Sequence, residues 1–256
     1  MQVVAVQLNM VWQDKSANHR RVLRLLDAAD FDRGALIVLP EMFETGFSMD
    51  VQATAQTEAR QGETFLRELA AKYDAAVMGG VAGEIVNQMS SNQAVAFAPD
   101  GTELVRYQKM KPFSLTGEEK HYAAGAESKV FSWQDVQIAP FICYDLRFPE
   151  IFRDAVRKGA ELITLIACWP AVRSEHWVRL LQARAIENLA AVVGVNRCGA
   201  EPGLTFDGRS AAFDHMGKPL FEASDEEQVI VQDIDIESAR RWRDKFPALR
   251  DMDEAG

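Results

Sequence analysis

Three side chains that can carry out acyl chemistry each stand at or just after the end of a predicted strand. Cys143 follows the apolar run 136–142, and Glu41 follows the apolar run 35–39 after a single proline. Lys109 stands at the end of a segment whose apolar residues alternate. A thiol, a carboxylate and an ammonium can act as the nucleophile, the proton carrier and the oxyanion partner of an acyl-transfer reaction. Because open α/β folds place their sites at the carboxyl ends of strands, we expect the three side chains to converge at one edge of a sheet.

The residues after Cys143 predict a tight turn from the strand into a helix. Pro149 is typical of the first turn of a helix, and Gly159 lies past its end. A thiol on such a turn is held at the top of a sheet, where the backbone N–H groups that follow can point at the same ligand. Taken alone, Cys143 is as easily explained as a core residue, because free cysteine is among the most buried residue types. The other two side chains, taken singly, are more often solvated loop charges, so the joint placement carries the prediction.

The rest of the chain predicts a mixed arrangement of strands and helices. Further apolar or alternating runs predict strands at 2–8, 75–81, 91–98, 161–167, 191–195, 210–213, 219–222 and 229–234. Amphipathic stripes predict helices that begin at Ser16, before Phe65, at Ser174 and near Glu237. A hairpin turn at Pro99-Asp100-Gly101 joins segment 91–98 to the strand before Lys109. Helices cluster in two parts of the chain and hairpins in others, which favours mixed sheets.

Length, charge and cysteine content narrow the class of protein. The 256 residues carry no linker, repeat or low-complexity tract, so we expect a single domain over residues 1–256. A formal net charge of −10 argues against nucleic acid and against an anionic membrane surface as partners. No apolar stretch approaches the ~20 residues of a membrane span, and the N-terminus lacks a signal pattern. Three cysteines without a disulfide framework fit a reducing cytoplasm.

Other catalytic classes find less support in the residues. A papain-like hydrolase needs a catalytic histidine, and the four histidines match no such pattern. No cluster of histidine, cysteine and carboxylate has ligand spacing, so we expect no metal, and no glycine motif that cradles phosphate occurs. A binding protein without activity is an alternative of another class, because fold does not fix function. Such a protein is expected to lose one of Glu41, Lys109 or Cys143, and all three are present.

Three motifs resemble the signatures of the nitrilase superfamily of carbon–nitrogen hydrolases, in the same order and spacing. They are Leu39-Pro40-Glu41-Met42-Phe43, Tyr107-Gln108-Lys109 and Cys143-Tyr144-Asp145-Leu146-Arg147-Phe148-Pro149. The resemblance covers nearly the whole chain, from the first strand to Phe246-Pro247. It implies an α/β fold of four layers, an α-β-β-α sandwich with two sheets face to face. It also implies an enzyme that takes a small-molecule amide, needs no cofactor and forms a homodimer or higher homo-oligomer.

The resemblance gives each motif residue a role in amide hydrolysis. Cys143 as thiolate is expected to attack the amide carbon, with Glu41 carrying the proton to the departing ammonia and later activating water. Lys109 and the backbone N–H of Tyr144 are expected to hold the oxyanion. Glu118 matches a second glutamate that hydrogen-bonds the lysine and positions substrate in this family. If the resemblance to the family is set aside, Glu118 is explained almost equally well as a carboxylate of a surface loop.

One departure from the family pattern follows the catalytic lysine. Lys111-Pro112 stand where relatives usually have His-Leu, so Lys109 and Lys111 compete for the catalytic role. The spacing from Tyr107 favours Lys109, and we expect Lys111 to be a loop cation.

A second group of segments is most similar to bacterial omega-amidases, which act on 2-oxoglutaramate. These segments are 143–149, Cys168-Trp169-Pro170-Ala171, Arg173-Ser174, His176-Trp177 and 183–188. Such a substrate carries a carboxylate at the end opposite its amide, and an arginine fork pairs with a carboxylate better than an ammonium does. Arg173 is the expected partner, with Lys111 as the alternative and an ordinary salt bridge as the competing explanation of Arg173. Nitrilases, N-carbamoyl amino acid amidohydrolases, deaminated glutathione amidases and acyltransferases remain alternatives within the superfamily.

The remaining side chains of interest are assigned by position. Trp169, Phe47, Phe113 and His176 are the other expected substrate contacts, although large aromatic residues are more often core. Asp145 and Arg147 are expected to form an ion pair that braces the Cys143 turn. The other cysteines, Cys168 and Cys198, are expected to be buried and inert.

Overall fold

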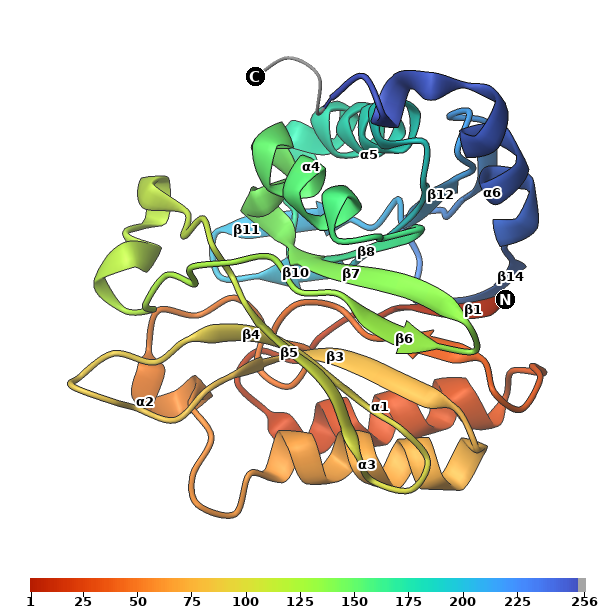
Figure 1. Cartoon of the computed structure of the whole chain (residues 1–256). Helices are drawn as coiled ribbons and strands as arrows, with labels where there is room; N and C mark the ends of the chain where they lie inside the picture. Colours follow the sequence, from red (N-terminus) through yellow and green to blue (C-terminus); the bar gives the residue numbers. More distant parts are fainter. Residues whose placement is uncertain (253–256) are drawn as a thin grey trace.

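Two six-stranded sheets lie face to face at the centre of the computed structural model, which describes residues 1–252 (Figure 1). The first sheet has the order β14 (Gln228–Asp233), β1 (Gln2–Gln7), β2 (Leu36–Val38), β3 (Ala76–Ala82), β4 (Asn92–Phe97) and β5 (Glu103–Gln108). The second has the order β13 (Pro219–Glu222), β12 (Ala211–Phe213), β9 (Ala191–Asn196), β8 (Leu162–Ala167), β7 (Val136–Ile142) and β6 (Phe131–Trp133). A separate hairpin joins β10 (Cys198–Glu201) to β11 (Leu204–Asp207).

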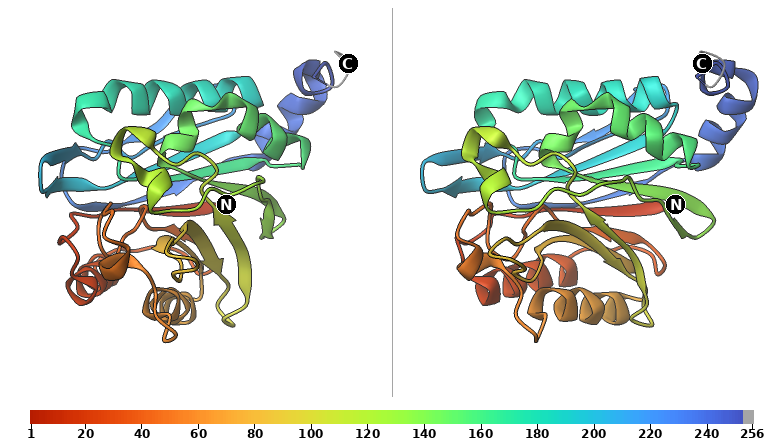
Figure 2. Two further views of the ribbon diagram at one scale, coloured as in Figure 1. Left: turned by 90° about the vertical axis from the view of Figure 1, so that its left-hand side faces the viewer. Right: turned by 60° about the vertical axis from the view of Figure 1, so that its left-hand side comes forward.

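Helices cover the outer face of each sheet, which confirms the predicted α-β-β-α sandwich (Figures 1 and 2). The first sheet is covered by α1 (Lys15–Asp27) and α3 (Gln61–Tyr73), and the second by α4 (Pro149–Arg157) and α5 (Ser174–Asn188). The remaining α-helices are the short α2 (Val51–Thr54) and α6 (Ile236–Lys245) near the end of the chain. Five 3₁₀ turns connect these elements: η1 (Ser114–Thr116), η2 (Glu118–Lys120), η3 (Cys143–Arg147), η4 (Ala171–Arg173) and η5 (Pro247–Leu249). None of the helices in residues 1–252 is long and apolar enough to cross a membrane.

The space between the sheets is filled by apolar side chains, many of them small. Strands β1, β2 and β3 are parallel to one another, and so are β7, β8 and β9. A strand that is covered on both faces needs an apolar residue at nearly every position. This explains why the sequence shows continuous apolar runs there. The residues of the first sheet that belong to this apolar cluster include Val3, Ala5, Val38, Ala76, Met78, Ala94 and Ala96, and Thr164 of β8 contacts the sulfur of Met78 at 3.6 Å across the interface.

The predicted elements agree with the structure, with two kinds of exception. Each predicted strand is present with ends within one residue of the expected ones. The helix predicted to begin at Ser16 is instead capped by Asp14, whose carboxylate accepts the backbone N–H of Ala17 at 2.9 Å. That prediction of the cap is wrong because the hydroxyl of Ser16 turns back to the same carboxylate, at 3.1 Å. Three elements were not predicted from the sequence: β6, the short helix α2 and the β10–β11 hairpin.

The topology brings the carboxyl ends of several strands to one side of the molecule. Strand β5 is antiparallel to β4, and β4 is antiparallel to β3, so β5 ends at the same edge as β2 and β3. Glu41 comes shortly after β2, and Lys109 comes directly after β5. In the second sheet, Cys143 directly follows β7 and Cys168 directly follows its parallel neighbour β8. The fold therefore places four chemically active side chains at one end of the sandwich.

Candidate active site

Cys143 lies at the start of η3, between the buried strand β7 and helix α4. Its backbone has φ of 46°, in the left-handed region that a residue with a side chain occupies only when its surroundings hold it there. Helix α4 begins at Pro149 and ends just before Gly159, as predicted. The strand, strained turn and helix together have the form of a nucleophile elbow, which holds a side chain out from the top of a sheet.

The carboxylate of Asp145 holds this turn in place. Its Oδ2 accepts the backbone N–H of Ile142 at 3.0 Å and the hydroxyl of Tyr107 at 2.7 Å, and its Oδ1 accepts the backbone N–H of Lys111 at 2.9 Å. Burial raises the pKa of Asp145 to about 7, against the opposing effect of the Tyr107 hydroxyl. The predicted ion pair between Asp145 and Arg147 is wrong. The carboxylate of Asp145 instead accepts hydrogen bonds from these three neutral donors.

Lys109 bridges two buried carboxylates. Its Nζ donates to Glu41 Oε1 at 3.0 Å and to both oxygens of Glu118, at 3.0 and 2.8 Å. All three side chains are at most 1% exposed. We call Glu41, Lys109 and Glu118 the inner cluster. The structure thus places Glu118 beside Lys109 and not on the surface.

Backbone and amide donors complete the inner cluster. The second oxygen of Glu41, Oε2, accepts the backbone N–H of Cys168 at 2.8 Å. Oε2 of Glu118 accepts the backbone N–H of Phe113 at 2.6 Å. The side-chain amide of Asn92 donates to Oε1 of Glu41 at 2.7 Å and to Oε1 of Glu118 at 3.0 Å. Both carboxylates are therefore held in one orientation from several elements.

The inner cluster contains two carboxylates and only one ammonium, and the excess negative charge affects the pKa of the neighbouring Cys143. Burial and the negative charge of Glu41 raise the pKa of the Cys143 thiol well above its ordinary value, although Lys109 opposes them. Burial lowers the pKa of Lys109, but Glu41 and Glu118 outweigh it and leave that pKa well above its usual range. Lys109 is therefore a permanent cation, and a thiolate at Cys143 forms only if its proton moves to a nearby acceptor.

Cys143 opens into a cavity of about 130 Å³ whose walls are mostly apolar. The residues that line it are Phe47, Phe113, Leu115, Thr116, Cys143, Tyr144, Arg147, Cys168, Trp169, Pro170, Arg173 and Leu204. The aromatic residues Phe47, Phe113 and Trp169 are thus brought to the cavity, as the sequence predicted. A cavity of this size with the Cys143 thiol in its lining suits a small acyl compound.

Two arginines line the same cavity without a carboxylate partner. Within residues 1–252, neither Arg147 nor Arg173 forms an ion pair with an acidic side chain, so the salt bridge considered for Arg173 is absent there. The guanidinium of Arg173 lies over the ring of Phe113 at 5.3 Å, and that of Arg147 lies over Trp169 at 4.9 Å. Charged side chains that face a cavity in this way can pair with an anionic ligand.

Two of the predicted contacts lie outside the cavity lining. His176 is exposed, and its Nδ1 is 3.1 Å from Nη2 of Arg147, so it can orient that arginine but does not line the cavity. Lys111 leans over the ring of Phe148 at 4.8 Å, with its Nζ 3.7 Å from a carboxylate oxygen of Glu150. The geometry therefore favours an arginine over Lys111 as a partner for an anion in the cavity.

The two remaining cysteines are buried, as predicted, but in different surroundings. Cys198 is 1% exposed in β10, away from the cavity lining, and burial raises its pKa to about 11. Cys168 is 5% exposed and lines the cavity, with its Sγ–H donating to the backbone carbonyl of Glu41 at 3.2 Å. Burial and the charge of Glu41 raise the pKa of Cys168 well above its ordinary value. Cys168 is therefore a thiol at the site and not part of the core alone.

Sequence reasoning missed Asn92, Arg147 and Cys168 as members of the site. For Asn92 a signal was available, because the hairpin turn at 99–101 sets a register that pairs it with Lys109. Arg147 was assigned to Asp145 on proximity in sequence alone. The residues that the structure describes contain no group of three or more histidine, cysteine or acidic side chains that could hold a metal ion.

Both the sequence and the fold of this chain match those of known proteins. The family model for carbon–nitrogen hydrolases matches residues 2–244. The omega-amidase YafV of Yersinia enterocolitica is 36% identical over 256 residues, covering 99% of this chain and 97% of that protein. The 2-oxoglutaramate amidase of Bacillus subtilis is 32% identical over 218 residues, covering 85% and 84%. A CN-hydrolase superfamily protein from Xanthomonas campestris, solved with an arsenic adduct in its active site, aligns with a TM-score of 0.90 at 33% identity, covering 98% and 96%.

Proposed function

Because this chain belongs to the carbon–nitrogen hydrolase family and is an amidase, we propose that it hydrolyses the omega-amide of a short dicarboxylic acid. The best candidate is 2-oxoglutaramate, which would yield 2-oxoglutarate and ammonia. The observation that carries the proposal is that one small cavity is lined by Cys143 and by two arginines, neither of which pairs with a carboxylate of residues 1–252. An omega-amide of a dicarboxylic acid has the two matching ends, an amide for the thiol and a carboxylate for an arginine.

In the first step, Sγ of Cys143 forms a bond to the amide carbon as its proton passes to Glu41. Oε1 of Glu41 already accepts two hydrogen bonds, from Asn92 and Lys109, and Oε2 accepts one from Cys168. An ionised carboxylate offers about four acceptor directions, so the remaining one, on Oε2, is available for the thiol proton. Passing the proton to Glu41 leaves the net charge of the buried groups unchanged, which avoids the cost of a free buried thiolate.

The negative charge that develops on the carbonyl oxygen needs donors fixed in advance. Lys109 supplies a permanent ammonium, and the backbone N–H of Tyr144 directly follows the nucleophile. Glu118 also holds Lys109, through both of its carboxylate oxygens. Because Glu118 already accepts four hydrogen bonds, it serves as a fixed counter-charge and not as a second proton carrier.

The second half of the reaction reverses the proton path. Glu41 gives its proton to the leaving nitrogen, the carbon–nitrogen bond breaks, and ammonia departs from a thioester on Cys143. A water molecule then loses a proton to Glu41 as its oxygen attacks the thioester carbon. The carbon–sulfur bond breaks, and Cys143 recovers the proton from Glu41 as the acid leaves.

The far carboxylate of the substrate is assigned to Arg173, with Arg147 beside it in the same cavity. Both guanidinium groups rest on aromatic rings, which holds them against the apolar wall without neutralising their charge. A bidentate pair with one of them would fix the distance between the carboxylate and the amide carbon. We further propose that the enzyme acts in the cytoplasm as a homodimer or higher homo-oligomer.

The test compares two substrates and two variants. Ammonia release is measured on 2-oxoglutaramate and on an uncharged amide of similar length, with wild type, Arg173→Met and the control Arg179→Met. Loss of a charge-assisted hydrogen bond should raise KM for 2-oxoglutaramate about 10- to 100-fold in Arg173→Met, with far less change for the uncharged amide. Arg179 lies on α5, is largely exposed and pairs with Glu175 at 3.6 Å, so its loss should leave both substrates unaffected.

Two results would contradict the proposal. Equal losses on both substrates would remove Arg173 from the carboxylate site. The enzyme is also tested on a panel of omega-amides, N-carbamoyl amino acids and aliphatic nitriles. If it hydrolysed no omega-amide, its activity would belong to another branch of the family.

A further inference from the structure

Asn92 occupies a position that no catalytic role yet explains. It begins β4, is 1% exposed, and lies opposite Lys109, whose backbone N–H donates to the Asn92 carbonyl at 2.8 Å. Its amide nitrogen donates one hydrogen bond to Glu41 and one to Glu118, at 2.7 and 3.0 Å. Asn92 does not line the cavity, so it contacts the two carboxylates and not the substrate.

The other end of the Asn92 amide shows that this orientation has a cost. Its Oδ1 is buried and has no hydrogen-bond partner within residues 1–252. A buried acceptor without a partner is unfavourable, and such groups call for an explanation. Turning the amide over would set this oxygen against two carboxylates, which is worse. The side chain is thus held in place by the two negatively charged acceptors on its nitrogen.

The electrostatics explain why two donors are needed there. Glu41 and Glu118 share one ammonium, so one negative charge of the pair has no cation of its own. The other titratable groups that interact with this pair are Cys143 of η3, Cys168 after β8, Tyr122 after η2 and Glu201 of β10. None of these supplies a positive charge. Neutral donors such as the Asn92 amide must therefore stabilise the ionised carboxylates.

We propose that Asn92 is a positioning residue for the reaction, which fixes the orientation of Glu41 and directs its one free acceptor site, on Oε2, toward the proton of Cys143. The inference rests on the proposed role of Glu41 as proton acceptor. Without the two amide hydrogens, Glu41 and Glu118 lose a donor that they share, and Glu41 is no longer held with its free site toward Sγ. Transfer of the thiol proton then becomes slower.

The test follows activity and thiol reactivity against pH in Asn92→Ala and Asn92→Asp. The acid limb of kcat/KM should move to higher pH by about one unit or more, because a hydrogen bond to a charged group has been lost. kcat near neutral pH should fall about 10- to 100-fold with KM nearly unchanged. Asn92→Asp has the same shape but adds a third carboxyl group, so it should be the more damaged of the two.

Alkylation of Cys143 by iodoacetamide gives a readout that does not depend on the substrate. Its rate, followed by mass spectrometry of the Cys143 peptide, should show the same displaced acid limb in both variants. If Asn92→Ala fails to fold, Asn92→Ser keeps one donor and should show a smaller displacement. Asn188→Ala is the matched control, because Asn188, on α5, is also fully buried, and its Oδ1 has no partner within residues 1–252. Its nitrogen donates to the backbone carbonyl of Arg184 at 2.9 Å and to Glu187 at 3.4 Å, and neither contact is to the inner cluster. That variant should lose stability without moving either pH profile.

The outcomes separate this inference from the proposed function. Unshifted profiles in the Asn92 variants, or full activity in Asn92→Asp, would overturn the positioning role and leave Cys143 as nucleophile. A wild-type enzyme whose activity survives complete alkylation of Cys143 would instead overturn the proposed function.

Discussion

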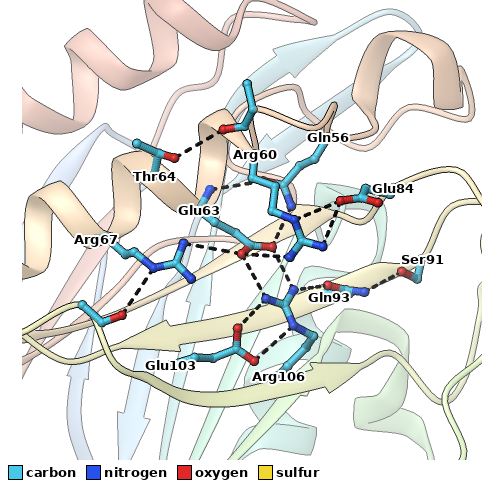
Figure 3. Close-up of polar contacts among 12 residues, drawn as sticks. Gln56, Arg60, Glu63, Thr64, Arg67, Glu84, Ser91, Gln93, Glu103 and Arg106 are labelled. Atoms are coloured by element: carbon cyan, nitrogen blue, oxygen red, sulfur yellow. Dashed lines mark hydrogen bonds and ion pairs between the residues drawn. The ribbon is translucent and has the colours of Figure 1, made fainter.

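Within residues 1–252, two ionic clusters differ in how many cations contact each buried carboxylate. In the inner cluster, two carboxylates share one ammonium. On the outer face of the first sheet, the carboxylate of Glu63 on α3 is surrounded by three guanidinium groups (Figure 3). Arg106 of β5 binds it through both oxygens at 2.9 and 3.0 Å, and Arg60 and Arg67 lie at 3.5 and 3.7 Å. We call Glu63 and these three arginines the outer cluster.

The cations and carboxylates around the titrating groups shift the pKa values of Glu63 and Cys143 in opposite directions. Burial tends to raise the pKa of Glu63, but its hydrogen bonds from Arg106 and Gln56 and the charges of the arginines outweigh burial and lower that pKa. In the inner cluster, burial and the extra carboxylate charge raise the pKa of Cys143. Although Glu84 and Glu103 pair in turn with Arg60 and Arg106, Glu63 itself is contacted by three guanidinium groups, so it stays ionised and serves to hold structure. A cluster with surplus carboxylate has room for one more proton, which is what a proton carrier requires.

The two clusters lie on opposite faces of the same hairpin. Successive side chains of a strand point to opposite faces, so Asn92 faces the inner cluster while its neighbour Gln93 accepts a hydrogen bond from Arg106 at 2.6 Å. Likewise, Tyr107 points inward to Asp145 while Arg106 points outward (Figure 3). The outer cluster therefore fastens the β4–β5 hairpin to α3, behind the residues that hold Lys109.

Substitution of Lys109 should give the largest effect on catalysis. Lys109→Met keeps the length of the side chain but removes the oxyanion donor, so kcat/KM should fall by at least about 10²–10³. Lys111→Met is the control and should retain most activity, because its ammonium lies near Glu150 and outside the cavity lining. Thermal unfolding of both variants shows whether the fold is intact. If Lys111→Met were inactive and Lys109→Met active, the catalytic lysine would be Lys111 and the assignment of Lys109 would be contradicted.

Substitution in the outer cluster should reduce stability and not the chemical step. Arg106→Met leaves Glu63 buried with two more distant arginines, and we expect the free energy of unfolding at neutral pH to fall by about 3 kcal/mol. Because the folded-state pKa of Glu63 is lowered, the stability that it contributes is present above its unfolded-state pKa and is lost as pH falls through the folded-state value.

Urea unfolding of wild type and Arg106→Met at several pH values checks this sign. The difference between the two should be largest near neutral pH and should shrink in acid. At a temperature where Arg106→Met stays folded, its kcat should be close to that of wild type. A large loss of kcat in a folded variant would show that the two clusters do not have separate tasks.

The sequence was sufficient to predict which residues converge, because strand direction decides it. Glu41, Lys109 and Cys143 each stand at a strand end, and the alternation of β3, β4 and β5 sends the lysine to the same edge as the glutamate. Hydrophobic runs predicted the buried strands for the same reason, since a strand covered on both faces needs apolar residues throughout.

The sequence could not predict the contacts that depend on how the two sheets pack. Asp145 is followed two residues later by Arg147, yet its carboxylate is taken by Tyr107 from the opposite sheet. Arg147 lines the cavity instead, so that two arginines and not one are available to the proposed substrate. The backbone N–H of Cys168, which fixes Oε2 of Glu41, leaves no signal in the sequence because any residue type could supply it.

The most direct test of the account is whether the acyl group passes through the thiol of Cys143. Hydroxylamine added during turnover of 2-oxoglutaramate should intercept the thioester, so that hydroxamate forms at the expense of the free acid while ammonia release continues. Cys143→Ala should fold and form neither product, whereas Cys168→Ala should form both. Ammonia release without hydroxamate at any hydroxylamine concentration, or hydroxamate formation by Cys143→Ala, would contradict the assignment of the inner cluster and Cys143 as the catalytic machinery.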